Sequence, residues 1–236
     1  MYGENFGTKN DGTCRIVSLN INCLGVNING NYKADILKDW LFNNEVDICG
    51  LQEVGVAQHM LKRHEKLAER MRDSRRHTTR IGTACNKHEA IDKFQYGGTA
   101  IIAYELLANM VRVSGADNTG LGRWTHFQLE GHRGKRVRII SAYNPCRTPT
   151  HHYSTVYSQH KRYFNEQKRD VCPRKQFRRD LCSFITECQN GGEYIILLID
   201  CNENLTKNHD LQQHLTTEPI LLIDPIRLRH GDLNNL

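Results

Sequence analysis

Short apolar runs of strand length recur along this chain and limit its fold more than any other feature. They cover residues 14–21, 46–51, 97–104, 110–113, 124–129, 136–143 and 193–199. Val, Ile, Leu and aromatic residues are frequent in them, and Gly-rich turns separate several, as is typical of β-strands. The four runs between residues 97 and 143 follow one another with no helical pattern between them, which indicates antiparallel pairing.

Helical patterns lie between the other strands. Residues 33–44 space their apolar side chains as an amphipathic helix does. Pro173 separates two further helical patterns, at 153–169 and 174–189. The segment 58–76 is polar and rich in helix formers, which predicts an exposed, basic helix. Adjacent strands with helices outside them predict an α/β (α+β) fold: a four-layer α/β/β/α sandwich of two mostly antiparallel sheets flanked by helices.

The chain is long enough for one large domain, and it has no internal repeat or linker beyond its polar first dozen residues. We therefore expect a flexible segment at 1–13 and a single domain over 14–236. No apolar run approaches the roughly 20 residues that span a bilayer, so no membrane partner is expected. The nine cysteines are odd in number and form no CxxC pair. We expect reduced thiols in an intracellular protein, with the nucleus as one option.

Positive charge is concentrated in two blocks. Residues 58–80 hold eight Lys or Arg against three acids, and residues 136–180 hold eleven against three, whereas residues 1–57 and 181–236 are net acidic. Solvated helix faces explain any single basic residue. Two dense blocks in one domain favour a polyanionic partner.

Three polar clusters each follow an apolar strand, where side chains emerge at the end of a sheet. They are NIN at 20–22, QE at 52–53 and DCN at 200–202. Carboxylate and amide oxygens are ligands that suit Mg²⁺. Each cluster alone is also typical of an ordinary turn or cap, so only their combination indicates a site.

Taken in order, the motifs SLNIN, LQEV, GGTAII, SAYNPC and LLIDCNEN resemble those of the endonuclease/exonuclease/phosphatase superfamily. That group includes apurinic endonucleases, deoxyribonuclease I-like enzymes and the endonuclease domains of non-LTR retrotransposons. The resemblance runs from about residue 15 to about residue 204, most of the chain. It implies metal-assisted hydrolysis of a phosphodiester.

The resemblance also implies the residues that bind the metal and the scissile phosphate. Glu53 matches the main Mg²⁺ ligand, with Mn²⁺ as an alternative ion, and Asn22 matches a second residue of the metal shell. Asn20 and Asn202 match residues that orient the phosphate and support this shell.

The resemblance also implies which residues transfer a proton and which stabilise charge. Asp200 matches the residue that positions or deprotonates the attacking water, and Tyr143 matches a residue that contacts the phosphate or the developing charge. Arg147 and Arg123 are the candidate phosphate or nucleic-acid contacts. Cys146 is a departure, because the family usually has Asn after this proline.

A second departure concerns the family's last strands, which carry an Asp and an Asp-His pair. No matching segment precedes Leu236, so we expect a domain that is incomplete at its C-terminus and lacks its last strands. Losing one donor to the transition state typically costs about 10²–10³ in rate. We therefore expect this chain to bind nucleic acid in a salt-sensitive manner and to cleave it poorly.

The leading hypothesis is a Mg²⁺-dependent phosphodiester hydrolase that acts on nucleic acid as an endonuclease of retrotransposon type, with DNA favoured over RNA. One alternative is a non-catalytic nucleic-acid-binding remnant of a retroelement protein. Another is a phosphoinositide or lipid phosphodiesterase of the same superfamily, which the basic charge disfavours. Oligomeric state and preference for abasic sites stay open.

Overall fold

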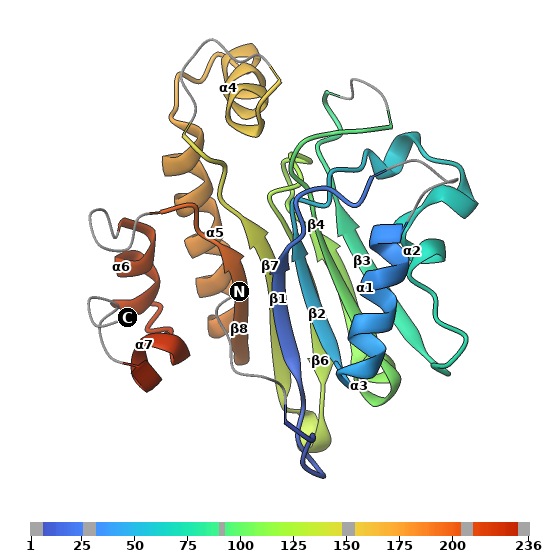
Figure 1. The fold of residues 1–236 in the computed structure, drawn as a ribbon. Helices are drawn as coiled ribbons and strands as arrows, with labels where there is room; N and C mark the ends of the chain where they lie inside the picture. The colour runs from blue at the N-terminus through green and yellow to red at the C-terminus, as the bar shows by residue number, and fades with distance from the viewer. Residues whose placement is uncertain (1–6, 26–31, 90–92, 148–153, 204–209, 231–236) are drawn as a thin grey trace.

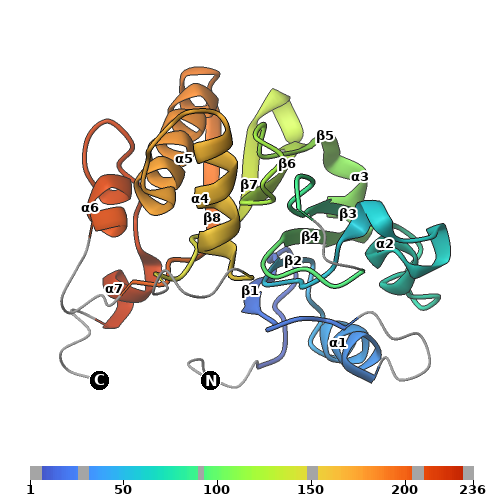
Figure 2. The same ribbon diagram turned by 90° about the horizontal axis from the view of Figure 1, so that it is seen from above.

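The computed structural model describes residues 7–25, 32–89, 93–147, 154–203 and 210–230, and in these residues the chain forms two four-stranded sheets (Figure 1). The sheets pack face to face, and helices cover the outer face of each. Viewed from above, two helices, α1 (Tyr32–Asn43) and α2 (Leu67–Arg70), lie on one side of the paired sheets. Three others, α4 (Val156–Glu166), α5 (Pro173–Asn190) and α6 (Asp210–Thr216), lie on the other side (Figure 2). The predicted four-layer sandwich is confirmed.

The first sheet contains, in spatial order, β1 (Ile16–Asn20), β2 (Ile48–Gln52), β4 (Thr99–Tyr104) and β3 (Thr79–Ala84). β1 and β2 are parallel and the other pairs are antiparallel. Helix α1 (Tyr32–Asn43) covers the outer face, where Leu37 and Leu41 pack with Cys49 and Leu51 of β2. Of the apolar residues at 33–44, Leu37, Trp40 and Leu41 therefore face this sheet, whereas Ile36 is 64 % exposed.

The second sheet contains, in spatial order, β5 (Val111–Ala116), β6 (Trp124–Glu130), β7 (Arg136–Tyr143) and β8 (Glu193–Asp200). Its first two pairs are antiparallel, and β7 and β8 are parallel. Helix α5 (Pro173–Asn190) covers its outer face, with α4 (Val156–Glu166) and α6 (Asp210–Thr216) beside it. Phe177, Leu181 and Ile185 of α5 are buried in the core between helix and sheet.

A third core lies between the sheets, where a buried polar network is also found. Gln52 Nε2 donates hydrogen bonds to Ser141 Oγ (3.0 Å) and to the Leu198 carbonyl oxygen (3.3 Å), and Ser141 Oγ donates to the Leu51 carbonyl oxygen (3.0 Å). These bonds join β2 to β7 and β8. Gly50 permits this close approach, because a Cβ there would lie 2.7 Å from Leu198 Cδ1.

The predicted helix at 58–76 is wrong. This segment forms two 3₁₀ turns, η2 (Gln58–Met60) and η3 (Arg63–Glu65), and one short helix, α2 (Leu67–Arg70). Two side chains bind backbone amides that a continuous helix would pair with carbonyl oxygens. Glu65 Oε2 accepts a hydrogen bond from the Lys62 amide, and Gln58 Oε1 accepts one from the Leu67 amide. Four further elements were not predicted from the sequence: β3, α3 (Glu105–Met110), α6 and α7 (Pro225–His230).

The predicted flexible segment 1–13 is only partly described. Within residues 7–13, the Lys9 ammonium contacts the Asp47 carboxylate at 2.7 Å. Residues 1–6 lie outside the described part. No helix in the described residues is both long enough and apolar enough to cross a membrane.

Candidate active site

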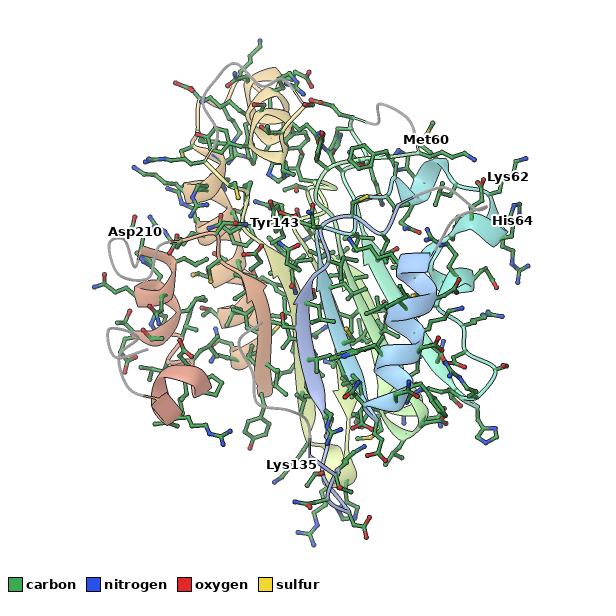
Figure 3. The ribbon with its side chains drawn as sticks, in the orientation of Figure 1. Met60, Lys62, His64, Lys135, Tyr143 and Asp210 are labelled. Atoms are coloured by element: carbon green, nitrogen blue, oxygen red, sulfur yellow. The ribbon has the colours of Figure 1, made fainter. Side chains whose placement is uncertain are left out.

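Four strands end at the same edge of the sandwich and bring the predicted residues there. β1 ends at Asn20, β2 at Gln52, β7 at Tyr143 and β8 at Asp200. Tyr143 and Asp200 are register partners, as are Asn20 and Gln52. Figure 3 shows Tyr143 at this edge, with Lys135 at the opposite end of the molecule.

One hydrogen-bonded group contains three of the predicted residues. Asn20 Nδ2 donates to Asp200 Oδ2 at 2.7 Å. Asn202 donates to the same carboxylate twice, from its amide nitrogen to Oδ1 (3.2 Å) and from Nδ2 to Oδ2 (3.2 Å). The Asp200 carboxylate is therefore held in one orientation by residues from both sheets.

The other three predicted residues, Asn22, Glu53 and Tyr143, line one pocket of about 320 Å³. Burial raises the pKa of Tyr143, and the neighbouring Glu53 carboxylate raises it further by accepting a hydrogen bond from the phenol. The phenol is therefore protonated at neutral pH and is a hydrogen-bond donor. Cys146 also lines this pocket, and its thiol donates to Asn202 Oδ1 at 2.8 Å, which links the pocket to the hydrogen-bonded group.

Three of these residues have left-handed backbone conformations: φ is 42° at Asn22, 54° at Glu53 and 47° at Asn202. Residues other than glycine adopt such angles at a cost, so surrounding bonds must hold them. The Asn22 amide donates to Asn20 Oδ1 (2.9 Å), and the Glu53 carbonyl accepts from the Cys23 amide (2.7 Å). Strained residues of this kind cluster at functional sites.

The two candidate phosphate contacts differ in exposure and in ion pairing. Arg147 is exposed and lines a hollow beside the pocket. Arg123 is 2 % exposed, and its guanidinium pairs with the carboxylates of Asp117 (2.6 Å) and Asp180 (2.7 Å). The prediction that Arg123 contacts phosphate is wrong, because its donors are occupied by carboxylates inside the protein.

Two polar residues near the site were not predicted from the sequence. Gln52 was noted only as a neighbour of Glu53, yet its buried amide joins the sheets beneath the site. In the sequence, Gln52 is distinguished only as a glutamine that directly follows the apolar residues 48–51. Asn144 is 2 % exposed, and no pattern in the sequence distinguished it.

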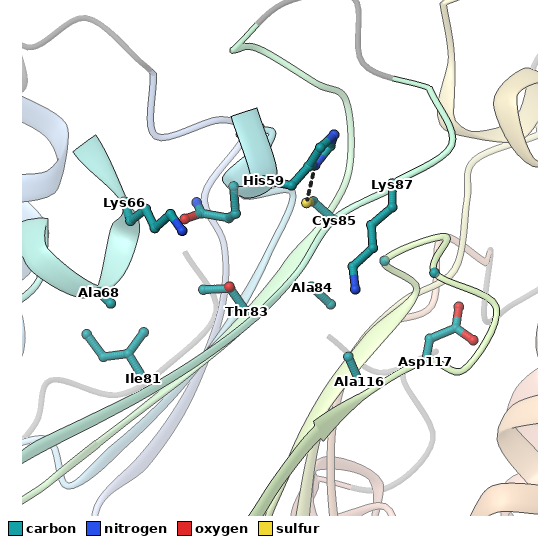
Figure 4. A pocket seen from close by; sticks show the side chains of 13 residues that line it. His59, Lys66, Ala68, Ile81, Thr83, Ala84, Cys85, Lys87, Ala116 and Asp117 are labelled. Carbon is teal, nitrogen blue, oxygen red and sulfur yellow. Dashed lines mark hydrogen bonds between the residues drawn. The ribbon is translucent and has the colours of Figure 1, made fainter. Parts of the chain in front are cut away.

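A separate pocket of about 270 Å³ shares no residue with the site (Figure 4). The side chains of Lys66 and Lys87 line it, and His59 Nδ1 lies 3.5 Å from Cys85 Sγ. Burial raises the pKa of the Cys85 thiol, so this Cys–His pair lacks the thiolate of a catalytic dyad.

The residues at the strand ends fit Mg²⁺. Glu53 contributes a carboxylate and Asn22 an amide oxygen to one pocket, and Mg²⁺ completes such a partial set with water and substrate phosphate. Within the described residues, no group of three or more His, Cys, Asp or Glu side chains could form a closed metal cage. A site of this kind depends on phosphate to complete its shell.

Comparisons by sequence found neither a family model nor a curated protein that matches the chain. Comparisons by structure found clear similarities. An endonuclease/exonuclease/phosphatase family protein from Leptotrichia buccalis aligns with TM-score 0.53 and 14% identity, over 86% of this chain and 74% of that one. An AP endonuclease from Archaeoglobus fulgidus aligns with TM-score 0.51 and 13% identity, over 86% and 68%.

TDP2 from Caenorhabditis elegans aligns with TM-score 0.51 and 18% identity, over 94% of this chain and 55% of that one. At identities this low, the similarity concerns the fold. This chain has the fold of the endonuclease/exonuclease/phosphatase superfamily.

Proposed function

We propose that the protein is a Mg²⁺-dependent phosphodiesterase that cleaves nucleic acid internally, with DNA preferred to RNA. One observation carries the proposal: Asn20, Asp200 and Asn202 form one hydrogen-bonded group, and the Cys146 thiol joins it to the pocket that contains Glu53. These residues come from four separate parts of the chain. Their convergence at strand ends supports a common chemical task.

In this proposal Asp200 takes a proton from the attacking water, because Asn20 and Asn202 hold its carboxylate in a fixed orientation. The water oxygen forms a bond to phosphorus, and the bond from phosphorus to the leaving oxygen breaks. The Tyr143 phenol orients the Glu53 carboxylate. Mg²⁺ held by Glu53 and Asn22 would stabilise charge on the phosphate oxygens and on the leaving alkoxide.

Exposed basic charge supports a nucleic-acid substrate. In the block 58–80, several cations have structural roles: Arg75 pairs with Asp39 and Asp73, and Arg70 donates to the Gly25 carbonyl oxygen. Its exposed members include Lys62, at the edge of the molecule away from α5 (Figure 3). The block 136–180 contributes Arg147 beside the pocket. Phosphate contacts of this kind provide most of the non-specific affinity for nucleic acid.

Cleavage of supercoiled plasmid tests the proposal. The sequence contains no Ser-Asp-His segment, so the assay uses protein in excess over plasmid and follows a single turnover. We expect nicking with Mg²⁺, none with EDTA, and a loss of about 10³-fold or more in Glu53→Gln. Glu130→Gln removes an exposed carboxylate at the opposite end of β6 and serves as the matched control.

Two results would contradict the proposal. Plasmid binding without any Mg²⁺-dependent nicking would make the chain a binding protein without turnover. Nicking that is equal in Glu53→Gln and Glu130→Gln would show that the catalytic residues are elsewhere.

The retrotransposon type is a further part of the proposal, and a reverse-transcriptase-like reading frame joined to this gene would support it.

A further inference from the structure

A basic hollow adjoins the candidate active site. It has a volume of about 280 Å³ and lies where the end of β7 and the segment after β8 meet the beginning of α5. Two contacts join it to the active-site pocket. Asn202 of the hollow accepts a hydrogen bond from Cys146 of the pocket, and Cys172 Sγ of the hollow lies 3.7 Å from the hydroxyl of Tyr157, which lines the pocket.

Four cations line the hollow, and two of them are held by neighbouring groups. Arg174 donates to the Pro145 carbonyl oxygen (2.7 Å) and to Glu203 Oε1 (3.1 Å), and Arg178 pairs with Asp210 (3.2 Å). Arg147 and Lys175 are exposed, and neither has a carboxylate partner among the residues that the structure describes. The hollow therefore has two cations that are able to bind an anion.

Asn144, which lines the hollow, also has a buried acceptor that lacks a donor. Asn144 is 2 % exposed, and its Nδ2 donates to the Cys201 carbonyl oxygen at 2.8 Å. Only a donor can face a carbonyl oxygen, so this bond fixes which side of the amide carries oxygen. Within the described residues, Oδ1 is buried and accepts no hydrogen bond. A buried acceptor of this kind is unfavourable until a donor reaches it.

An anion satisfies Arg147 and Lys175, whereas Asn144 Oδ1 requires an N–H or O–H group. A phosphodiester oxygen has no proton to donate, so phosphate alone meets only the first requirement. A nucleotide meets both, because its phosphate is anionic and its base or sugar carries donors. The position next to Asn202 places such a ligand beside the proposed scissile phosphate.

We infer that this hollow is a nucleotide subsite of the proposed nuclease. Arg147 and Lys175 bind the phosphate that neighbours the scissile one, and Asn144 Oδ1 accepts a hydrogen bond from the base or sugar of that nucleotide. The assignment rests on the proposed function, because it takes the strand to be cleaved as its ligand.

Binding of fluorescein-labelled octathymidylate in EDTA tests the two cations without requiring cleavage. We expect Arg147→Ala/Lys175→Ala to weaken binding about 10-fold or more and to reduce the salt slope by about one. Arg147→Lys/Lys175→Arg should restore most of the affinity. Arg112→Ala/Lys135→Ala is the matched control, since it removes two exposed cations at the opposite end of the second sheet and should change affinity by less than about twofold.

Alkylation of Cys172 tests occupancy of the hollow directly. Cys172 precedes α5, and although its partial burial raises the pKa, the backbone amides of Lys175 and Arg174, the Tyr157 hydroxyl and the Arg147 charge together lower it. Iodoacetamide should modify it readily. Thymidine 5′-monophosphate should slow this modification several-fold more than equimolar inorganic phosphate, because only the nucleotide supplies a donor to Asn144. Cys14, read from its own peptide by mass spectrometry, is the internal control.

The outcomes separate the subsite from the proposed function. If octathymidylate binds and depends on Arg147 and Lys175 but no strand is cleaved with Mg²⁺, the subsite stands and the proposed function fails. If the Arg147/Lys175 variant binds as the Arg112/Lys135 control does, or wild-type protein does not bind, the subsite is wrong. Equal protection by inorganic phosphate, or tighter competition by inositol trisphosphate than by octathymidylate, would overturn the nucleotide assignment.

Discussion

The side-chain amide of Asn20 donates a 2.7 Å hydrogen bond to Asp200 Oδ2, although the two residues are 180 positions apart in the sequence. Asn20 ends β1 in the first sheet and Asp200 ends β8 in the second. The bond therefore spans the two sheets at the edge where both strands finish. It depends on the packing of the sheets, and it orients the carboxylate that we propose as the base.

The first prediction concerns this pair. Asn20→Ala and Asp200→Asn should each lower the single-turnover rate of plasmid nicking by roughly 10²-fold, since a positioned base contributes about that much. The double variant should be little worse than the more damaging single variant, because both remove one function. Additive losses would show that the two residues act independently. Thermal unfolding of each variant provides the control for folding.

The second prediction concerns the metal. Glu53 and Asn22 offer one carboxylate and one neutral oxygen to the pocket, so Mg²⁺ should bind weakly until phosphate completes its shell. Calorimetry should detect little heat from Mg²⁺ alone and a clear signal in the presence of an oligonucleotide. Tight binding of Mg²⁺ without nucleotide, or binding that persists in Glu53→Gln, would contradict the assignment.

The third prediction concerns the contact between the sheets. Gly50→Ala places a Cβ 2.7 Å from Leu198 Cδ1 and 3.3 Å from Ser141 Oγ, so it should lower the free energy of unfolding by about 1–3 kcal/mol. Urea denaturation measures this change. Gly7→Ala, where nothing lies within 4 Å of the new Cβ, is the matched control. Adding Leu198→Ala should cost less in the Gly50→Ala background than in wild type, because it removes the clash.

The fourth prediction concerns acid stability. Burial lowers the pKa of His160 to about 3 and that of His126 to about 4, below the usual 6.5. The unfolded chain therefore binds more protons than the folded one as pH falls below 6.5. Below pH 6.5 each histidine should remove up to roughly 1.4 kcal/mol of stability per pH unit until its folded pKa is reached, and little of this loss occurs above pH 6.5.

The measurement is urea denaturation between pH 7 and pH 4.5. The slope of stability against pH should be smaller in His160→Gln than in wild type, whatever the cost of the substitution at pH 7. His77→Gln, at an exposed position, is the matched control for the substitution itself. Equal slopes in all three proteins would show that His160 is not held in its neutral form.

The apolar runs and the polar residues that follow them determine strands and strand ends by themselves. Strand character is a local property, because alternating or continuous apolar side chains suit a pleated, buried surface. Helix α5 and five strands were therefore predictable; the strands lie at residues 14–21, 46–51, 97–104, 136–143 and 193–199. β3 was missed, because its sequence TRIGTA lies at the edge of a sheet and lacks a strong apolar pattern.

Tertiary structure alone decided which residues meet. Arg123 and Arg147 are alike in sequence terms, yet the carboxylates of Asp117, six residues away, and of Asp180, 57 residues away, enclose Arg123 while Arg147 stays exposed. The segment 58–76 has helical composition, but the side chains of Gln58 and Glu65 bind its backbone and break the helix. Such pairings join groups that are far apart in the chain or compete with local preferences. The free-energy contribution of local propensity is small compared with these interactions, so the packing of the sheets determines which residues are paired.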